Sequence, residues 1–267
     1  MLKDITLGQY FPGDSFVHRL DPRTKLIMVI LYIIALFLAS GFLGYAVMIA
    51  VTAGFIALSK VPPKSMFRGL KSVVLIIVLT ALLNVFYTDG TVLVQVWKLK
   101  ITYEGIIRAV FMVLRIVMLI CGTFLLTYTT TPVALTDGME LLLNPLKKLK
   151  VPVHEMSMMM SMALRFIPTL IEETDKIMSA QKARGADFET GSLMDRAKAL
   201  LPILVPLFVS AFRRADELAI AMESRCYNGG AGRTRMKQLR YQGGDYAALG
   251  FGVLLIVLMI GLQVIGL

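Results

Sequence analysis

The sequence has few charged residues and few of the side chains on which hydrolytic enzymes and metal sites depend. Only 17% of its 267 residues are Asp, Glu, Lys or Arg, whereas an average soluble domain has about 25%. It contains two histidines, no H-E-x-x-H pattern and no G-x-S-x-G motif, which argues against a membrane enzyme. What it does have is 57% hydrophobic content, which predicts a protein of the lipid bilayer.

Three further absences limit the function. There is no G-x-x-x-x-G-K-[ST] loop, so the chain cannot by itself hold ATP in that way, and we expect no cofactor or metal in it. Its two cysteines, Cys121 in an apolar run and Cys226 in a basic segment, provide no disulfide framework. Residues 1–25 lack an apolar core, so we expect no cleavable signal peptide. Any ATP-driven role therefore requires partner subunits.

Long apolar runs predict the membrane-spanning helices, because roughly 20 helical residues cross a hydrocarbon core ~30 Å thick. The first run is too long for one span and is broken at Ser40-Gly41, which predicts a tight helical hairpin. Just before it, Asp21 is placed to cap a helix whose first residue is Pro22. The predicted fold is all-α, a polytopic membrane protein with about five transmembrane helices. We place these spans near 26–40, 42–59, 73–87, 106–130 and 246–267.

The basic residues predict the orientation. The connection 60–72 has four basic residues and no acid, whereas 88–105 balances two of each sign, so the first is expected in the cytoplasm and the second outside. Alternation then gives an N-terminal membrane domain at 1–130 that starts in the cytoplasm, a cytoplasmic coupling-helix domain at 131–245 and a final transmembrane helix at 246–267. The net charge of +10 is explained by this distribution and requires no nucleic acid.

Two arginines within the fourth span leave two interpretations open. Arg108 and Arg115 lie seven residues apart, on one face of a helix. Either Arg108 reaches the outer interface and Arg115 faces a protein neighbour, or both line a substrate path. The absence of an Asp or Glu partner within the spans weighs against a substrate path.

The cytoplasmic domain is predicted to contain three helices. The first runs through MELLLNPLKKLK, 139–150, and its lysines would lie near anionic headgroups. The second, about 154–184, and the third, about 193–226, each begin apolar and end charged. We therefore expect both long helices to run from membrane depth toward the cytosol.

Each of these two helices ends in an arginine. Asp175 precedes Arg184 by nine residues, and Asp216 precedes Arg225 by nine. Each arginine alone could simply interact with the negative end of its helix, and Gly185 is a typical residue just past a helix end. As a pair, they could instead form bidentate bonds to carboxylates of a partner. Small neighbours would let each tip enter a groove closely: Ala183, Gly185, Ser224 and Cys226.

Three segments carry a resemblance to a known family: LDPRTKL near the start, QKARGADF, and MESRCYNGGAGRT. They resemble the transmembrane T component of energy-coupling factor transporters, which are ABC importers of vitamins and trace metals, and the resemblance covers the whole chain. It implies that two Ala-Arg-Gly-like motifs insert into grooves of two ATPase subunits. The ATPase-docking residues would then be Ala183, Arg184 and Gly185, and Ser224, Arg225 and Cys226. The second motif departs from the pattern, because a cysteine adopts a left-handed conformation less easily than glycine.

The same resemblance implies the partners. These are two ABC ATPase subunits that bind ATP and Mg, a substrate-binding membrane S component, and the lipid bilayer of a prokaryotic cell membrane. The chain itself would be a non-catalytic subunit for vitamin or trace-metal uptake. A self-contained secondary transporter or channel is the alternative, although it predicts interrupted spans and buried ionisable residues.

A run of methionines also has two interpretations. They either fill the interior of the domain or form an adaptable surface that accepts different S components. The residues are Met156, Met158, Met159, Met160 and Met162.

Overall fold

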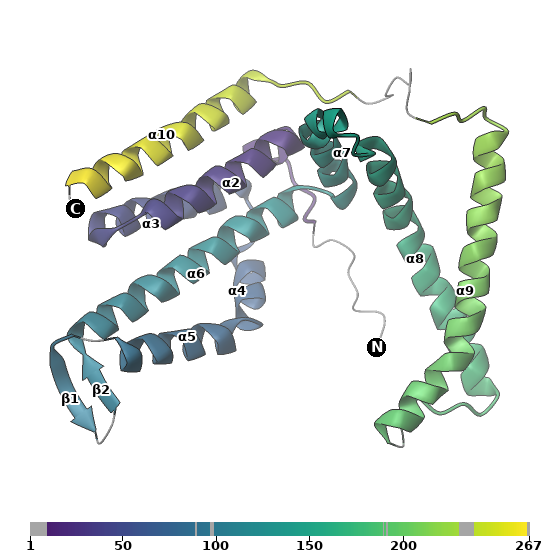
Figure 1. Cartoon of the computed structure of the whole chain (residues 1–267), viewed down its shortest axis with the longest axis horizontal. Helices are drawn as coiled ribbons and strands as arrows, with labels where there is room; N and C mark the ends of the chain where they lie inside the picture. The colour runs from purple at the N-terminus through teal and green to yellow at the C-terminus, as the bar shows by residue number, and fades with distance from the viewer. Residues whose placement is uncertain are drawn as a thin grey trace. The chain divides into compact units, whose positions relative to one another are not determined.

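The structure, a computed structural model, describes residues 10–88, 90–96, 99–188, 190, 192–229 and 238–265. These residues divide into two compact units. We call residues 10–139 together with 239–265 the membrane unit, and residues 140–229 the α8–α9 unit (Figure 1). The boundaries expected at 131 and 245, between transmembrane and cytoplasmic segments, depend on where the bilayer lies. They stay predictions.

The membrane unit is built from apolar helices that lie side by side (Figure 1). Among its described residues, two antiparallel strands form in the connection 88–105, for which the sequence predicted no regular structure. The elements are α1 (Phe16–Arg19), α2 (Pro22–Leu38), α3 (Gly41–Ser59), α4 (Pro63–Lys71), α5 (Val74–Tyr87), β1 (Val92–Val96), β2 (Leu99–Thr102), α6 (Tyr103–Thr129), most of α7 (Pro132–Leu143), and α10 (Gly243–Ile265).

The expected all-α, multi-pass membrane architecture is confirmed. Among the described residues, α3, α6 and α10 are long and apolar enough to cross a membrane, and α4 with α5 forms a fourth candidate bent by 65°. The remaining predicted span, 26–40, corresponds to α2, whose 17 residues are near the lower limit for a span. Positions 266 and 267 of the last predicted span lie outside the described residues.

The connection 60–72 is not the loop that the sequence predicted. It contains α4, which begins with Pro63 at its first turn and is anchored by Met66, only 3% exposed. Its basic side chains Lys64, Arg68 and Lys71 are exposed on the outside of this short helix. The apolar residues of α4 pack against the rest of the membrane unit, and this contact stabilises the helix. The composition of the segment does not reveal such a contact.

Capping interactions join the beginnings of α2 and α10. As predicted, Asp21 caps α2: its Oδ1 accepts a hydrogen bond of 2.9 Å from the Arg23 backbone N–H, and Pro22 is the first residue. The Asp21 backbone N–H in turn donates to Oδ1 of Asp245 at 2.9 Å, and Gln242 N–H donates to its Oδ2 at 2.7 Å. Asp245 is 1% exposed, so this carboxylate is a buried connection between the two helices.

The core of the membrane unit lies between α2, α3, α6 and α10. A Cβ at Gly122 of α6 would come within 2.5 Å of the Tyr32 ring, so only glycine allows α6 to approach α2 this closely. The Tyr32 hydroxyl then reaches Thr52 of α3 at 2.7 Å. The buried hydrophobic residues of this cluster are Tyr32, Ala35, Leu36, Ala39, Tyr45, Met48, Met118, Leu255 and Met259.

The α8–α9 unit contains η2, a 3₁₀ helix (Asn144–Leu149), followed by the long helices α8 (Val153–Ala183) and α9 (Leu193–Glu223). Both long helices lie within a few residues of their predicted limits. The single helix predicted over 139–150 is wrong. Pro145 cannot donate a backbone hydrogen bond, so α7 ends at Leu143 and the chain tightens into η2.

The expectation that α8 and α9 run in the same direction is also wrong. Ser210 and Arg214 of α9 bond Glu173 of α8, and Pro202 accepts from Gln181, so earlier residues of α9 meet later residues of α8. The two helices are therefore antiparallel, and they cross within this unit (Figure 1). The similar apolar-to-charged sequences suggested a common direction, but a short connection between long helices favours an antiparallel pair.

Candidate partner-docking sites

The end of α8 is a compact turn that depends on Gly185. This residue has φ 87°, in the left-handed region, and a Cβ added to it would meet nothing within 4 Å. Its N–H bonds the Lys182 carbonyl at 3.0 Å, and the Ala186 N–H bonds the Gln181 carbonyl at 3.0 Å. These two bonds make a Schellman motif, with Arg184 as the last residue before the reversal.

The end of α9 has the same geometry without a glycine. Cys226 has φ 55°, its N–H bonds the Glu223 carbonyl at 2.8 Å, and the Tyr227 N–H bonds the Met222 carbonyl at 3.0 Å. Arg225 therefore stands where Arg184 stands in α8. The departure from the Ala-Arg-Gly pattern does not change the backbone, because the cysteine adopts the left-handed conformation.

Both arginines are presented to the outside. Arg184 and Arg225 are exposed, and neither guanidinium forms a hydrogen bond or ion pair with another described residue. An arginine that only stabilised its own helix end would be expected to bond the last carbonyls of the helix. The flanking residues predicted as part of each tip are exposed as well: Ala183, Gly185, Ser224 and Cys226.

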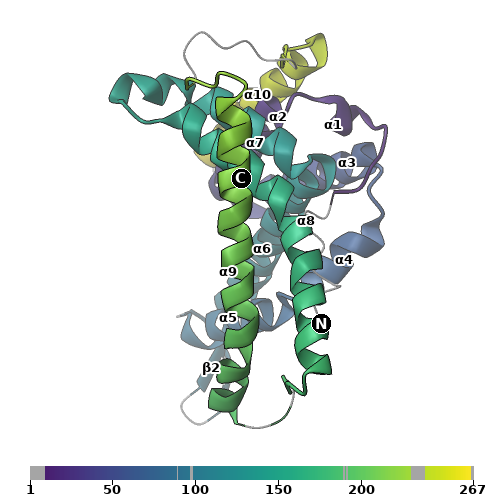
Figure 2. The same cartoon turned by 90° about the vertical axis from the view of Figure 1, so that its right-hand side faces the viewer.

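The two tips lie at opposite ends of the helix pair. Because α8 and α9 are antiparallel, Arg184 lies toward the beginning of α9, and Arg225 lies toward the beginning of α8 (Figure 2). Each helix has 31 residues. At ~1.5 Å per residue a helix of this length spans roughly 45 Å. The tips are thus too far apart to share one small binding site, and they can engage two separate surfaces.

Sequence comparison decides the family. The chain matches the family described as CbiQ, "Cobalt transport protein", over residues 13–237. The chain belongs to this family. It is 56% identical over 247 residues to the energy-coupling factor transporter transmembrane protein EcfT of Thermosediminibacter oceani, covering 92% of this chain and 93% of that protein. It is also 50% identical over 264 residues to EcfT of Bacillus subtilis, covering 98% and 100%.

Family membership identifies the chain as a transmembrane component of an energy-coupling factor transporter, in agreement with the resemblance of its motifs. It is accordingly a multi-pass membrane subunit of a transporter.

The methionine run of the T component is partly exposed. Met156, Met159 and Met160, at the beginning of α8, are 54%, 59% and 54% exposed, whereas Met158 and Met162 are partly buried. Filling of the interior therefore does not account for the first three. Such exposure of several large apolar side chains is typical of a surface that contacts lipid or protein.

A second apolar surface, on the first half of α9, was not singled out from the sequence. The sequence ALLPILVPLFVSAF is clearly apolar. It could be interpreted as an exposed surface only once α9 was known to lie at the surface of its unit. Its exposed side chains are Leu200, Leu201, Leu204, Val205, Phe208, Val209 and Phe212.

Polar contacts between α8 and α9 were also missed. Glu173 accepts hydrogen bonds from the Ser210 hydroxyl and, at 3.0 Å, from Nη2 of Arg214. The Ser210 hydrogen bond and the Arg214 guanidinium together hold the pKa of Glu173 below its usual range, although burial opposes them. Charged residues on long polar helices are usually solvated, so nothing in the sequence distinguished these two from their neighbours.

The arginines of the fourth span fit the first interpretation. Arg115 Nη2 lies 3.4 Å from the carbonyl oxygen of Ala39, just past the end of α2, and its guanidinium lies 5.5 Å from the Phe37 ring centre. A cation at this position interacts favourably with the negative end of α2. Arg108 is exposed, one helical turn after Glu104. Arg115 thus contacts a neighbouring helix of the same chain.

Proposed function

We propose that this T component is the non-catalytic coupling subunit of an ATP-driven importer, which links ATP hydrolysis by two ABC ATPase subunits to uptake of a vitamin or trace metal bound by an S component. The observation that carries the proposal is the pair of equivalent, outward-facing arginines at opposite ends of α8 and α9. Two equivalent tips separated by a helix length match two equivalent partner subunits.

Each tip docks by the same chemistry. Arg184 and Arg225 donate bidentate hydrogen bonds to carboxylates in a groove of one ATPase subunit each. The small side chains beside them, Ala183 with Gly185 and Ser224 with Cys226, permit close approach of the helix end. The ATPase subunits bind ATP and Mg, so the T component itself requires no site for either.

Movement of the ATPases is transmitted through the pair of long helices. The contacts of Glu173 with Ser210 and Arg214 join α8 to α9, so a force on either tip acts on both helices. The exposed methionines Met156, Met159 and Met160, flanked by Met158 and Met162, contact the S component. Their flexible side chains can adapt to partners of different shape.

The proposed setting is the cell membrane of a prokaryote. The N-terminus and the region 131–245 face the cytoplasm, as the basic connection 60–72 indicates, and no nucleic acid takes part.

The test is co-purification from cells that produce the T component with its ATPases and an S component. Arg184→Glu or Arg225→Glu places a carboxylate where the partner carboxylate binds, so we expect at least about a tenfold loss of ATPase association, or hydrolysis without uptake. Arg213→Glu is the matched control, because Arg213 is an exposed arginine in the middle of α9. Unchanged association and uptake in both tip variants, or uptake by the T component alone in liposomes, would refute the proposal and favour a self-contained transporter.

A further inference from the structure

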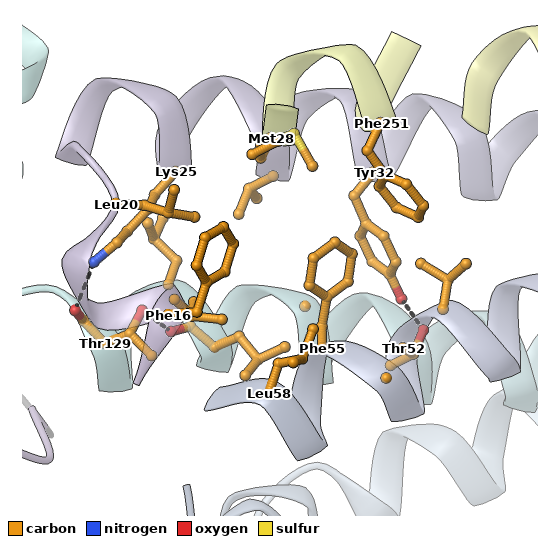
Figure 3. A pocket seen from close by; sticks show the side chains of 18 of the residues that line it. Phe16, Leu20, Lys25, Met28, Tyr32, Thr52, Phe55, Leu58, Thr129 and Phe251 are labelled. Atoms are coloured by element: carbon orange, nitrogen blue, oxygen red, sulfur yellow. Dashed lines mark hydrogen bonds between the residues drawn. The ribbon is translucent and has the colours of Figure 1, made fainter. Parts of the chain in front are cut away.

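The membrane unit contains an apolar pocket of about 360 Å³ between α1, α2, α3, α6 and α10 (Figure 3). Its walls are formed mainly by hydrocarbon side chains, and they include Phe16, Met28, Phe55, Leu125 and Phe251. An engineered apolar cavity of about 150 Å³ is large enough to bind benzene, so this pocket can accommodate a considerably longer hydrocarbon group.

The mouth of the pocket is apolar. Phe16, Leu58 and Phe251 are 53%, 55% and 41% exposed, whereas Lys25 and Thr52 behind them are each 6% exposed. The helices α3 and α10 that carry two of these rim residues are membrane-span candidates. An opening lined by phenylalanine and leucine on such helices gives access to the hydrocarbon of the bilayer.

The polar groups on the floor of the pocket are already satisfied within the protein. The Tyr32 hydroxyl lies 2.7 Å from Thr52 Oγ1 and 3.1 Å from the Met118 carbonyl oxygen, and Thr52 Oγ1 lies 2.7 Å from the Met48 carbonyl oxygen. Since none of these groups requires a ligand, the middle of the pocket selects for a purely apolar occupant.

One end of the pocket carries a positive charge. Lys25 Nζ donates to the carbonyl oxygen of Thr129 at 2.8 Å (Figure 3), and to the carbonyl oxygen of His18 at 3.1 Å. An ammonium has three donors, so one remains, and no carboxylate among the described residues lies within 4.0 Å of it. The carboxylates of Asp21 and Asp245 lie farther away but still interact favourably with this ammonium, so its charge does not require an anionic ligand.

We propose that this pocket binds one acyl chain of a bilayer phospholipid. A hydrocarbon chain gives the walls the dispersion contacts that an empty pocket lacks. The bilayer supplies this ligand at high concentration. The site is independent of the two arginine tips.

The glycines of the chain offer a clean test. Gly54 lines the pocket on α3, and a Cβ added there would meet nothing within 4 Å, so Gly54→Leu places a larger side chain at the pocket wall. Gly261 on α10 is equally unobstructed but does not line the pocket, which makes Gly261→Leu the matched control. Ala248→Leu fills the pocket from α10 and replaces Gly54→Leu should that variant fail to fold.

The experiment is native mass spectrometry of the full chain in mild detergent with added phosphatidylglycerol or phosphatidylcholine. The unmodified protein and Gly261→Leu should retain about one phospholipid of either kind, and Gly54→Leu should show about tenfold weaker retention. Equal retention by Gly54→Leu and Gly261→Leu, or no retained lipid at all, would overturn the site. Because ATPase association is measured separately, failure here leaves the proposed transport role unaffected.

Discussion

Cys226 adopts, at the end of α9, the left-handed conformation that Gly185 adopts at the end of α8. Both residues immediately follow an exposed arginine, and both donate to the carbonyl three residues earlier. The two helices therefore present their arginines in the same way although one tip lacks the glycine. We therefore expect a substitution at position 226 to change the stability of the protein and to leave the geometry of this helix end unchanged.

Replacing Cys226 by glycine should stabilise the protein while leaving ATPase docking intact. A left-handed residue with a Cβ costs ~1 kcal/mol, which glycine avoids. Cys226→Val should be less stable than the unmodified protein, since a branched Cβ is strained further at positive φ. Thermal unfolding of the purified protein measures both. Ser224→Gly is the control and should lower stability, because Ser224 has helical φ of −64°. A lower Tm for Cys226→Gly would contradict the prediction.

Removing the charge of Glu173 should weaken the link between α8 and α9. Glu173→Gln keeps an acceptor for Ser210 but loses the ion pair with Arg214, so we expect less uptake per ATP hydrolysed. Combining Glu173→Gln with Arg214→Gln should cost less than the sum of the single changes, because the two groups interact directly. Glu172→Gln changes an exposed neighbour and serves as the control. Additive effects would show that the pair does not couple the helices.

The same carboxylate predicts a dependence on pH. The pKa of Glu173 is lowered by its hydrogen bond from Ser210 and by Arg214. A lowered folded-state pKa means that the charged form contributes stability above the unfolded value of about 4.3, and that this contribution is lost as the pH falls further. Unfolding of the unmodified protein should therefore become easier relative to Glu173→Gln as the pH is lowered toward 3. A constant difference between the two proteins across this range would contradict the assignment.

Loss of the buried carboxylate of Asp245 should destabilise the membrane unit. Asp245→Ala leaves the buried N–H of Asp21 without its acceptor, at ~1–3 kcal/mol, whereas the N–H of the exposed Gln242 can bond water instead. Denaturation of the protein in detergent should reveal a loss of ~1–3 kcal/mol. Asp14→Ala, at an exposed position, should change stability little. Equal stability of the two variants would show that the connection between α2 and α10 contributes nothing.

The exposed methionines should matter for S-component exchange. Replacing Met156, Met159 and Met160 together by glutamine removes the apolar surface and should reduce co-purification of the S component, with the ATPases still bound. Replacement by leucine keeps the surface apolar but less adaptable, so different S components should be affected unequally. Unchanged recovery of every S component in the glutamine variant would refute this contact surface.

The local features of this protein could be predicted from its sequence. Apolar run length located the helices, Asp21 and Pro22 defined the start of α2, and Gly185 marked the end of α8, because each depends on residues close together in the chain. The family motifs predicted the T component for the same reason. The sequence did not predict α4 or the β1–β2 hairpin, because short amphipathic and extended segments form only where a neighbouring surface is available.

The contacts between residues far apart in the chain could be seen only in the folded structure. It made α8 and α9 antiparallel, which places Arg184 and Arg225 at opposite ends, and it selected Glu173, Ser210 and Arg214 from many similar polar residues. It also brought Lys25, Gly54 and Phe251 from three helices to one pocket. These relationships depend on packing between helices, and hydrophobic periodicity carries no information about which helix faces which.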